Sequence, residues 1–152
     1  MSKKFNFKLQ SVLRLKELKE DEIKGKLGQI VGKINTKLLA IEDYKNEVNM
    51  YFDRYEDAEK SKETMLGGLR AYMPEFLVSH YEKIRKCREE VEELTNTKNS
   101  LIEKLNQAKG QVKIFSNLKE KKYQDYKYKL NKKINDEIEE LIILKGSKNE
   151  KI

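Results

Sequence analysis

The sequence predicts an all-α fold, a long two-helix antiparallel coiled-coil hairpin that forms a single elongated coiled-coil domain over residues 1–152. Three observations lead to this prediction. Charged residues make up 39% of the chain and hydrophobic residues 38%, with one proline and no tryptophan, whereas average soluble proteins carry about 25% charged residues. Apolar residues recur at heptad spacing in two long segments. Helix-interrupting residues fall between these segments, near the middle of the chain.

The first helix is predicted from about residue 8 to residue 64. Its apolar residues recur at alternating steps of three and four, which places them on one helical face. The polar exceptions on this face are Lys16, Glu20 and Lys37. We expect the face to pack against a second helix. Its two series of core positions are Leu13, Glu20, Leu27, Ile34, Ile41, Val48 and Tyr55, and Leu9, Lys16, Ile23, Ile30, Lys37, Tyr44, Tyr51 and Ala58.

The connection is predicted at about residues 65–73, in the sequence MLGGLRAYMPEF. Gly67 and Gly68 each disfavour a helix interior by about 1 kcal/mol. Pro74 is unfavourable inside a helix but favourable in a first turn, where Glu75 is also well placed. We therefore expect a turn here, with or without a short helical piece inside it. The alternative, one continuous helix paired as a parallel homodimer, is disfavoured by the same residues.

The second helix is predicted from about residue 74 to residue 145. Beyond Phe115 its apolar residues continue at wider steps, which shifts the seam away from a left-handed supercoil. Two helices of similar length joined by a short connection pack antiparallel, so we expect both termini at one end. The seam positions are Leu77, Ile84, Val91, Lys98, Leu105 and Val112, then His80, Cys87, Leu94, Leu101, Ala108 and Phe115, and finally Leu118, Tyr126, Leu130, Ile134, Ile138 and Leu141.

Phe5 and Phe7 precede the first helix, at a place where chains usually fray. In an antiparallel hairpin with both termini at one end, they would lie beside the last turns of the second helix. We expect them to pack there, near Leu141, Ile142 and Leu144. The alternative is that they insert into a pocket of a partner protein.

Charge is distributed unevenly along the chain, whose net charge is +7. Residues 1–41 carry +6 and residues 98–133 carry +8, whereas residues 42–63 carry −4. An antiparallel hairpin places the two basic segments side by side. The half near the termini is therefore expected to be strongly basic and to favour an acidic partner.

No catalytic site, metal site or cofactor is predicted. His80 and Cys87 are the only residues of their kind, and one histidine with one cysteine makes a poor metal site. Both fall at core positions of the second helix, where packing is the commoner role. Nucleophilic catalysis also needs an orienting partner and an enclosed pocket, which two helices do not form. The protein is therefore not expected to be an enzyme.

Two further stretches have patterns that occur in binding sites. Residues 25–32, GKLGQIVG, lack the Gly-Lys-Ser/Thr ending of a phosphate-binding loop, and we expect Gly28 and Gly32 either to allow close approach of a neighbour or to add flexibility. In residues 123–129, YQDYKYK, tyrosines alternate with lysines, as in surfaces that stack on single-stranded nucleic acid. Tyrosines flanking a coiled-coil seam are the commoner interpretation.

The chain is expected to be cytoplasmic. Its lone cysteine rules out an internal disulfide and fits a reducing compartment. No apolar run approaches the roughly 18 residues that cross a membrane, so no direct membrane insertion is expected. Lys3 and Lys4 are not followed by the apolar stretch of a secretory signal.

Aromatic and other large apolar residues crowd near the predicted turn. Two helices cannot bury all of them, and exposed aromatic residues mark protein contacts more often than chance. We expect them either to bind a partner or to stiffen the turn by local packing. The group comprises Tyr44, Tyr51, Phe52, Tyr55, Tyr72, Met73, Phe76, Leu77 and Tyr81.

The opening FNFKLQSVLRLKELKEDE resembles the start of the FliJ family of bacterial flagellar export proteins. That family typically opens with Phe-x-Phe-x-Leu-x-x-Val-Leu followed by a charged helix. Length, the predicted hairpin and a late pair, Asp136 and Glu137, are similar too. The glutamate and glutamine often found before that pair are replaced here by a stretch rich in lysine and asparagine. The residues that match the opening are Phe5, Phe7, Leu9, Val12 and Leu13.

The resemblance implies a non-enzymatic, stalk-like coiled coil, similar to the gamma stalk of rotary ATP synthases. It implies roles in flagellum biogenesis, chemotaxis and type III protein export. The implied partners are the hexameric export ATPase, the cytoplasmic domain of the export gate membrane protein, and export chaperones. It also implies a cytoplasmic protein held peripherally at the inner face of the cell membrane through the export apparatus.

Candidate binding residues follow from position and charge. A stiff basic end suits a ring opening lined with carboxylates, and we expect ATPase contacts from Phe5, Phe7, Arg14, Lys16, Lys19, Lys121, Lys122 and Lys127. Family gate contacts involve aromatics and a histidine near the hairpin. By position, the resemblance implies that gate binding involves Tyr44, Tyr51, Phe76, Leu77 and His80.

Three alternatives remain at the level of sequence. A basic nucleic-acid-binding coiled coil would explain the lysines and tyrosines, although no recognised binding module supports it and no nucleic-acid partner is expected. A membrane-surface protein would need a wider apolar face and interfacial tryptophans. The equivalent stalk protein of a virulence injectisome would have the same sequence features.

Overall fold

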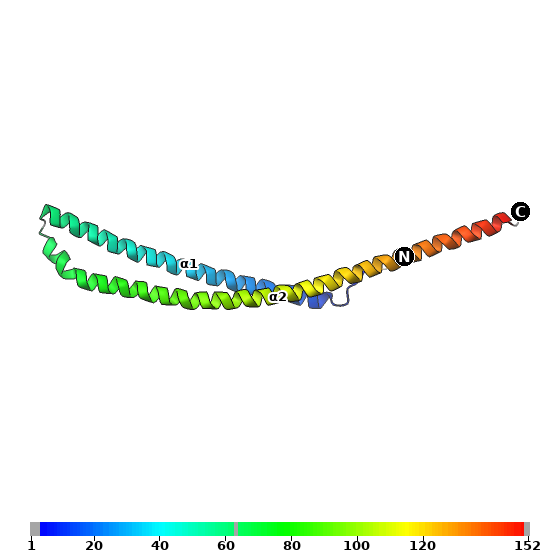
Figure 1. Cartoon of the computed structure of the whole chain (residues 1–152), viewed down its shortest axis with the longest axis horizontal. Helices are drawn as coiled ribbons and strands as arrows, with labels where there is room; N and C mark the ends of the chain where they lie inside the picture. Colours follow the sequence, from blue (N-terminus) through cyan, green and yellow to red (C-terminus); the bar gives the residue numbers. More distant parts are fainter. Residues whose placement is uncertain (1–3, 63, 151–152) are drawn as a thin grey trace. The chain divides into compact units, whose positions relative to one another are not determined.

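The computed structural model describes residues 4–62 and 64–150, the last three without their side chains, and contains two α-helices. α1 spans Gln10–Ser61, 52 residues, and α2 spans Leu66–Glu150, 85 residues. The two helices pack against each other, the structure is 94% helical, and the described residues include no strand (Figure 1). The predicted all-α helical hairpin is therefore confirmed.

The chain divides into two compact units. We call Glu22–Leu105 the turn unit, because it contains the connection between the helices. We call Met1–Asp21 together with Asn106–Ile152 the terminal unit. Each unit contains parts of both helices, and each is described separately below.

The core of the turn unit follows the predicted heptad positions. Ile23, Ile41, Val48 and Ala58 of α1 are buried, as is Ile84 of α2. Every other predicted seam position of this unit is buried or half-buried, including the polar Lys37. The heptad pattern therefore identified the helix faces that pack together.

The core of the terminal unit follows the same heptad positions, but burial of these positions ends before the end of α2. Leu13 and Ala108 are buried, and the seam positions of α2 remain at least half-buried as far as Leu130. From residue 131 to residue 147 every side chain is exposed. The apolar pattern of α2 thus extends beyond the part of the helix that has a packing partner in the described chain.

The connection between the helices lies earlier than predicted. α1 ends at Ser61 and α2 begins at Leu66, so the turn expected at residues 65–73 is wrong. Lys62 has a positive φ of 53°, the left-handed conformation that commonly ends a helix. Gly67, Gly68 and Pro74 all lie inside α2.

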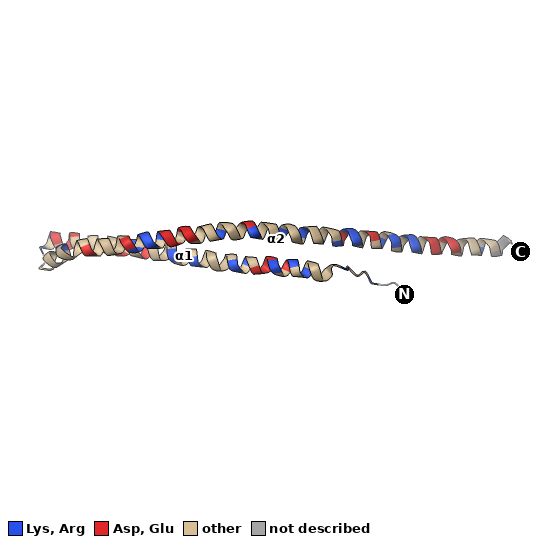
Figure 2. Cartoon of the chain, turned by 90° about the horizontal axis from the view of Figure 1, so that it is seen from below, with Lys and Arg blue, Asp and Glu red and all other residues tan. Residues whose placement is uncertain are grey.

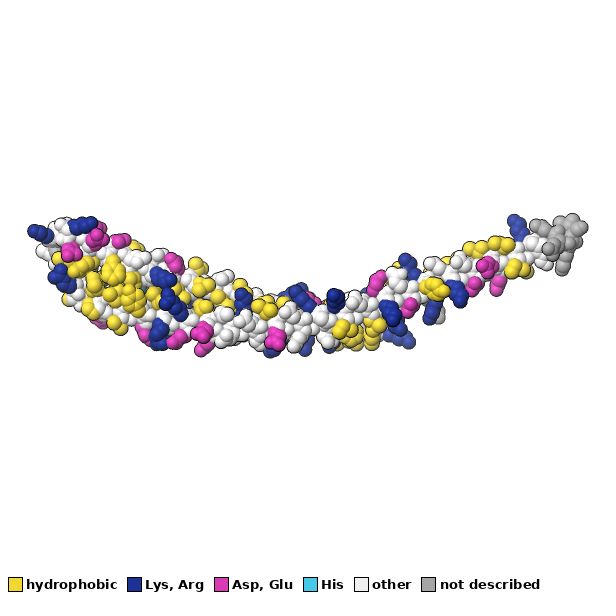
Figure 3. Space-filling model, viewed as in Figure 1, with side chains coloured by type: hydrophobic (Ala, Val, Ile, Leu, Met, Phe, Trp, Pro, Cys, Tyr) yellow, Lys and Arg dark blue, Asp and Glu magenta, His cyan; other side chains and the backbone are white. Residues whose placement is uncertain are grey.

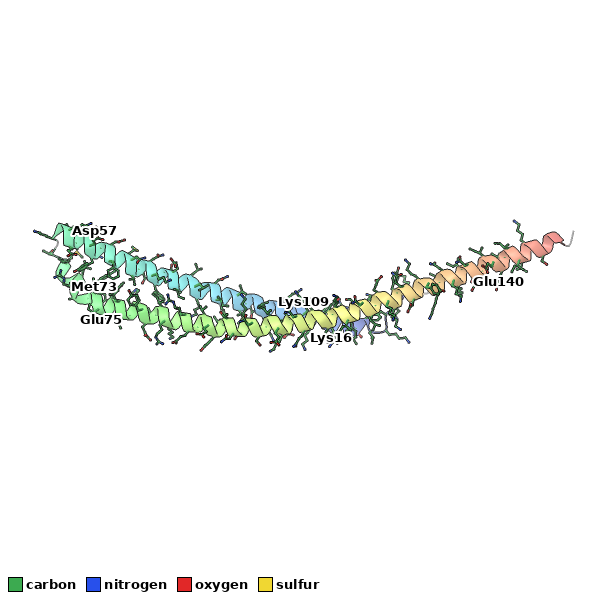
Figure 4. The ribbon with its side chains drawn as sticks, in the orientation of Figure 1. Lys16, Asp57, Met73, Glu75, Lys109 and Glu140 are labelled. Atoms are coloured by element: carbon green, nitrogen blue, oxygen red, sulfur yellow. The ribbon has the colours of Figure 1, made fainter. Side chains whose placement is uncertain are left out.

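Contacts with α1 explain why α2 tolerates these residues. The Tyr51 hydroxyl donates a hydrogen bond to the Leu69 carbonyl, and Arg70 Nε donates to the Tyr55 hydroxyl at 3.1 Å. These tertiary contacts support the first turns of α2 against their low helix propensity. Proline also bends helices, and α2 bends near its start in Figure 1, in the region of Met73 and Glu75 labelled in Figure 4.

The helices differ in length more than predicted, and the predicted position of the N-terminal phenylalanines is wrong. α2 has 85 residues against 52 in α1, and Leu141, Ile142 and Leu144 near its end are exposed. The Phe5 ring instead packs on two tyrosines of α2. Its centroid lies 5.3 Å from that of the Tyr123 ring and 5.6 Å from that of the Tyr126 ring. Because α1 is the shorter helix, the N-terminal residues meet α2 well before its end.

The glycines of α1 leave open space. A Cβ built at Gly25, Gly28 or Gly32 would have nothing within 4 Å. Of the two roles expected for Gly28 and Gly32, close approach of a neighbour is therefore wrong, and added flexibility stays a prediction. Replacing all three with alanine is expected to raise the free energy of unfolding by about 3 kcal/mol, because each glycine in a helix interior costs roughly 1 kcal/mol relative to alanine. Urea unfolding followed by circular dichroism measures this change.

Gly146→Ala provides the matched control for these substitutions. Gly146 also has open space around a built Cβ, but it lies near the end of α2, where helices fray. We expect little change in unfolding free energy from this variant. A triple variant no more stable than Gly146→Ala would show that the glycines of α1 do not weaken the helix.

Candidate functional site

Aromatic rings of both helices form a stacked cluster in the turn unit. The Phe76 ring of α2 stacks on Tyr51 of α1, with centroids 4.4 Å apart, and on His80, with centroids 4.0 Å apart. The Tyr44 ring meets His80 edge-on at 6.0 Å. Leu77, the residue after Phe76 on α2, is half-buried. The structure therefore brings together four of the five residues predicted for gate binding, and they contact one another.

His80 holds the centre of this cluster through two hydrogen bonds. Its Nδ1 lies 3.1 Å from the Phe76 carbonyl oxygen, and its Nε2 lies 2.5 Å from Glu47 Oε2 on α1. A carbonyl and a carboxylate both accept hydrogen bonds, so each ring nitrogen of His80 faces an acceptor. The His80 side chain is 10% exposed and that of Glu47 is 54% exposed. The Glu47 contact thus ties the buried ring across the two helices.

Exposed aromatic residues flank the stacked cluster in the sequence of α2. Tyr72 and Tyr81 are each about half exposed, at 52% and 54%. The Tyr72 ring lies 6.1 Å from Phe76, so it connects the stacked rings to the surface. Figure 3 shows hydrophobic side chains gathered on one face at the turn end of the helices. Local packing accounts for the inner rings, whereas Tyr72 and Tyr81 leave apolar surface available to a partner.

The terminal unit carries most of the positive charge. It contains 18 Lys and Arg against 10 Asp and Glu, a net +8, whereas the turn unit contains 15 against 16, a net −1. Figure 2 shows how the charged residues are distributed along each helix. All six cations predicted for ATPase binding belong to this unit. Lys16 is half-buried, and the exposed ones are Arg14, Lys19, Lys121, Lys122 and Lys127.

The N-terminal phenylalanines pack on α2 within the terminal unit. Phe7 is buried, at 7% exposure, and its neighbour Phe5 is half-buried against the tyrosines described above. Together with Leu118, Lys122 and Tyr126, they line a groove of about 550 Å³. Both rings therefore pack against other residues of the chain. Two of the three tyrosines considered for nucleic-acid stacking are engaged with Phe5.

An ion pair crosses between the helices of the turn unit. Lys37 Nζ lies 2.5 Å from Glu90 Oε2, so a lysine that interrupts the apolar heptad series finds a partner on α2. The hydrogen bond to Glu90 raises the pKa of Lys37, and the hydrogen bond from Lys37 lowers the pKa of Glu90. Lys37 was evident from the sequence as an exception to the apolar series, whereas its partner Glu90 and the His80 partner Glu47 were not, because pairing across helices depends on their mutual register.

Glu90→Gln is expected to destabilise the protein at neutral pH but to have less effect in acid. Because the folded pKa of Glu90 is lowered, the ion pair stabilises the fold above the unfolded pKa and loses its contribution as pH falls through the folded value. The difference in unfolding free energy between wild type and variant should therefore be constant from about pH 5 to 9 and shrink below about pH 4.

Urea unfolding at a series of pH values checks this expectation. Glu92→Gln is the control, because Glu92 is an exposed carboxylate on the same helix. Its difference from wild type should stay small throughout. A Glu90→Gln effect that grew as the solution was acidified would contradict the assigned ion pair.

Neither a metal-binding cluster nor a membrane-spanning helix occurs among the described residues. They contain no group of three or more His, Cys, Asp or Glu that could hold a metal ion, and Cys87 is half-buried with a free thiol. In the same part of the chain, no helix is long and apolar enough to span a bilayer. The candidate sites are therefore the aromatic cluster of the turn unit and the basic surface of the terminal unit.

Comparison with known proteins identifies the family. No curated protein and no solved structure matches the chain. A family model described as the flagellar FliJ protein matches residues 5–147, nearly the whole chain. This family consists of structural components of the flagellar export apparatus. With its opening Phe5 and Phe7, its helical hairpin and this match, the chain belongs to the flagellar FliJ protein family.

Proposed function

We propose that the protein is a non-enzymatic, stalk-like component of flagellar type III export that binds two partners through its two units. The terminal unit binds the hexameric export ATPase, and the turn unit binds the cytoplasmic domain of the export gate. The observation that supports this proposal best is the separation of surface character, with a net charge of +8 on the terminal unit and an aromatic cluster on the turn unit.

Electrostatics supports the assignment of the ATPase to the terminal unit. Arg14, Lys19 and Lys121 are among its exposed cations, and charges at an interface rim accelerate association with a partner of opposite sign. The opening of a ring lined with carboxylates would provide such a partner. Phe5 and Phe7 contribute by fixing the N-terminal segment against α2.

Exposed apolar surface supports the assignment of the gate to the turn unit. Interface hot spots are enriched in aromatic residues that lie in well-packed surroundings. Phe76 and His80 provide a packed base, and the exposed Tyr72 and Tyr81 provide contact area around it. The protein would thereby reach the inner face of the membrane through the gate, without a membrane span of its own, and would meet empty export chaperones there.

Gate binding is tested with the purified chain and the purified cytoplasmic domain of the gate protein. The double variant Tyr72→Ala/Tyr81→Ala is expected to weaken binding at least about tenfold, since each aromatic contact at an interface centre contributes about 1 kcal/mol or more. Both side chains are exposed, so the helical content should stay unchanged by circular dichroism. Isothermal titration calorimetry measures the affinity.

Leu39→Ala is the control for gate binding, because Leu39 is 67% exposed in the turn unit but is not part of the ring contacts. It should bind the gate domain as wild type does. Equal affinities for the double variant and for Leu39→Ala would contradict the assignment of gate binding to this cluster.

Participation in export itself is tested in the organism that encodes the protein. Deletion of its gene is expected to reduce the amount of flagellar hook and filament protein in the culture medium, and the wild-type chain should restore it. The Tyr72→Ala/Tyr81→Ala variant should restore less secretion than Leu39→Ala. Normal secretion in the deletion strain would contradict a role in export.

A further inference from the structure

The end of α2 presents an apolar stripe that no described part of the chain covers. Its members are exposed by between 44% and 65% of their surface. At 3.6 residues per turn they fall on one side of the helix, where they continue the seam formed with α1. An uncovered stripe of this kind is typical of a helix that pairs with another helix. We call it the terminal stripe, and it comprises Ile134, Ile138, Leu141 and Ile142, preceded by the half-buried Leu130.

The charges beside the terminal stripe are ordered along the helix. Lysines at 129, 132 and 133 come first, and acidic residues at 136, 137, 139 and 140 follow. Figure 2 shows this change from basic to acidic along the last part of α2. A parallel second helix of the same sequence would place like charges beside each other. An antiparallel one would place the basic segment beside the acidic segment.

One antiparallel alignment matches the apolar residues and the charges together. When Ile134 lies opposite Ile138 of a second copy, Leu130 lies opposite Ile142 of that copy. Lys133 and Glu140 are seven residues apart, two helical turns, and therefore share one flank of the stripe. In this alignment Lys133 of one copy and Glu140 of the other lie at nearly the same level. Their positions along the helix axis differ by about one residue, roughly 1.5 Å.

We propose that the terminal stripe pairs antiparallel with the same stripe of a second copy of this chain. Flanking pairs of Lys133 with Glu140 of the other copy, formed twice by symmetry, select this orientation. The stripe is short, so the interface belongs to the small class associated with weak or transient assembly. The proposal does not depend on the proposed export function.

Sedimentation equilibrium of the full chain tests the self-association. The average mass is expected to rise from monomer toward dimer between about 10 μM and about 0.5 mM, the range of a weak interface. Ile138→Lys should keep the chain monomeric across this range, because it places a charge in the centre of the stripe. A monomer at every concentration of wild type would overturn the proposal.

A charge exchange tests which residues flank the interface. Lys133→Glu is expected to raise the dimer dissociation constant at least about fivefold, and adding Glu140→Lys should restore it to within about twofold of wild type. Lys132→Glu is the matched control, because Lys132 has the same charge but points away from the stripe by its helical position. An equal effect of Lys132→Glu, or no restoration by the second exchange, would overturn the proposed alignment.

Thiol cross-linking tests the orientation. In a chain with Cys87→Ser, Glu137→Cys places a thiol near the centre of the antiparallel pair, whereas Lys145→Cys places one about 27 Å from its counterpart at 1.5 Å per residue. A short bis-maleimide should link the first variant into dimers and leave the second monomeric. Equal cross-linking of both variants would indicate a parallel pair and would overturn the proposal.

Discussion

Phe76→Ala is expected to lower the free energy of unfolding by about 3 kcal/mol. Phe-to-Ala changes in full cores cost about 3–5 kcal/mol, and Phe76 is half-buried. Its loss also removes two stacked contacts, with Tyr51 at 4.4 Å and with His80 at 4.0 Å, and aromatic pairs contribute about 0.5–1.5 kcal/mol beyond area burial. Urea unfolding monitored by circular dichroism measures the change.

Phe52→Ala is the control for this prediction. Phe52 lies in the same unit and is 40% exposed, outside the stacked cluster, so its loss should cost less than about 1 kcal/mol. The comparison separates the stacking of the rings from the general loss of a phenylalanine. If both variants lost the same stability, the cluster would not stabilise the turn unit in the way proposed.

The triple reversal Lys19→Glu/Lys121→Glu/Lys122→Glu is expected to weaken binding to the export ATPase about 100-fold at low ionic strength. Each surface cation contributes up to about 1 kcal/mol with an opposite charge, and reversal adds repulsion. Three such changes approach 3 kcal/mol, or a factor of about 100. Salt screens exposed charges, so the difference from wild type should shrink as ionic strength rises.

The control reverses three exposed lysines of the turn unit, Lys33, Lys45 and Lys86. This variant has the same change in net charge and should bind the ATPase within about threefold of wild type. Surface plasmon resonance at several salt concentrations gives both affinities. Equal weakening by the two variants would show that net charge, and not the terminal unit, determines binding.

The helix faces could be predicted from sequence because they depend on local spacing. Positions such as Leu13, Ile41, Ile84 and Leu105 were identified from the heptad alone, and all are buried. The period of a helix is fixed by backbone geometry, so a regular apolar pattern defines the buried side without knowledge of the partner helix.

The turn and the N-terminal packing could not be predicted in the same way. Gly67, Gly68 and Pro74 disfavour a helix locally, but contacts such as the hydrogen bond from Tyr51 to Leu69 come from a distant part of the chain. The position of Phe5 depends on where α1 begins relative to α2, which local spacing does not define. Propensity is a weak guide wherever tertiary contacts compete with it.

The candidate sites were likewise only partly predictable from the sequence. The basic segments and the aromatic residues were evident from composition, and the structure brings Tyr51, Phe76 and His80 into contact. The acidic partners of His80 and Lys37, which are Glu47 and Glu90, were missed. Such pairs require the register between two helices, and many alternative carboxylates occur at similar spacing in this sequence.

Cross-linking of the purified chain to the hexameric export ATPase, with the linked lysines identified by mass spectrometry, tests the proposed division between two binding units most directly. Both units contain exposed lysines, so the reagent itself does not favour either. We predict links to the ATPase from Lys19, Lys121, Lys122 and Lys127 of the terminal unit. Links confined to lysines of the turn unit, or no complex with the ATPase at all, would contradict the account.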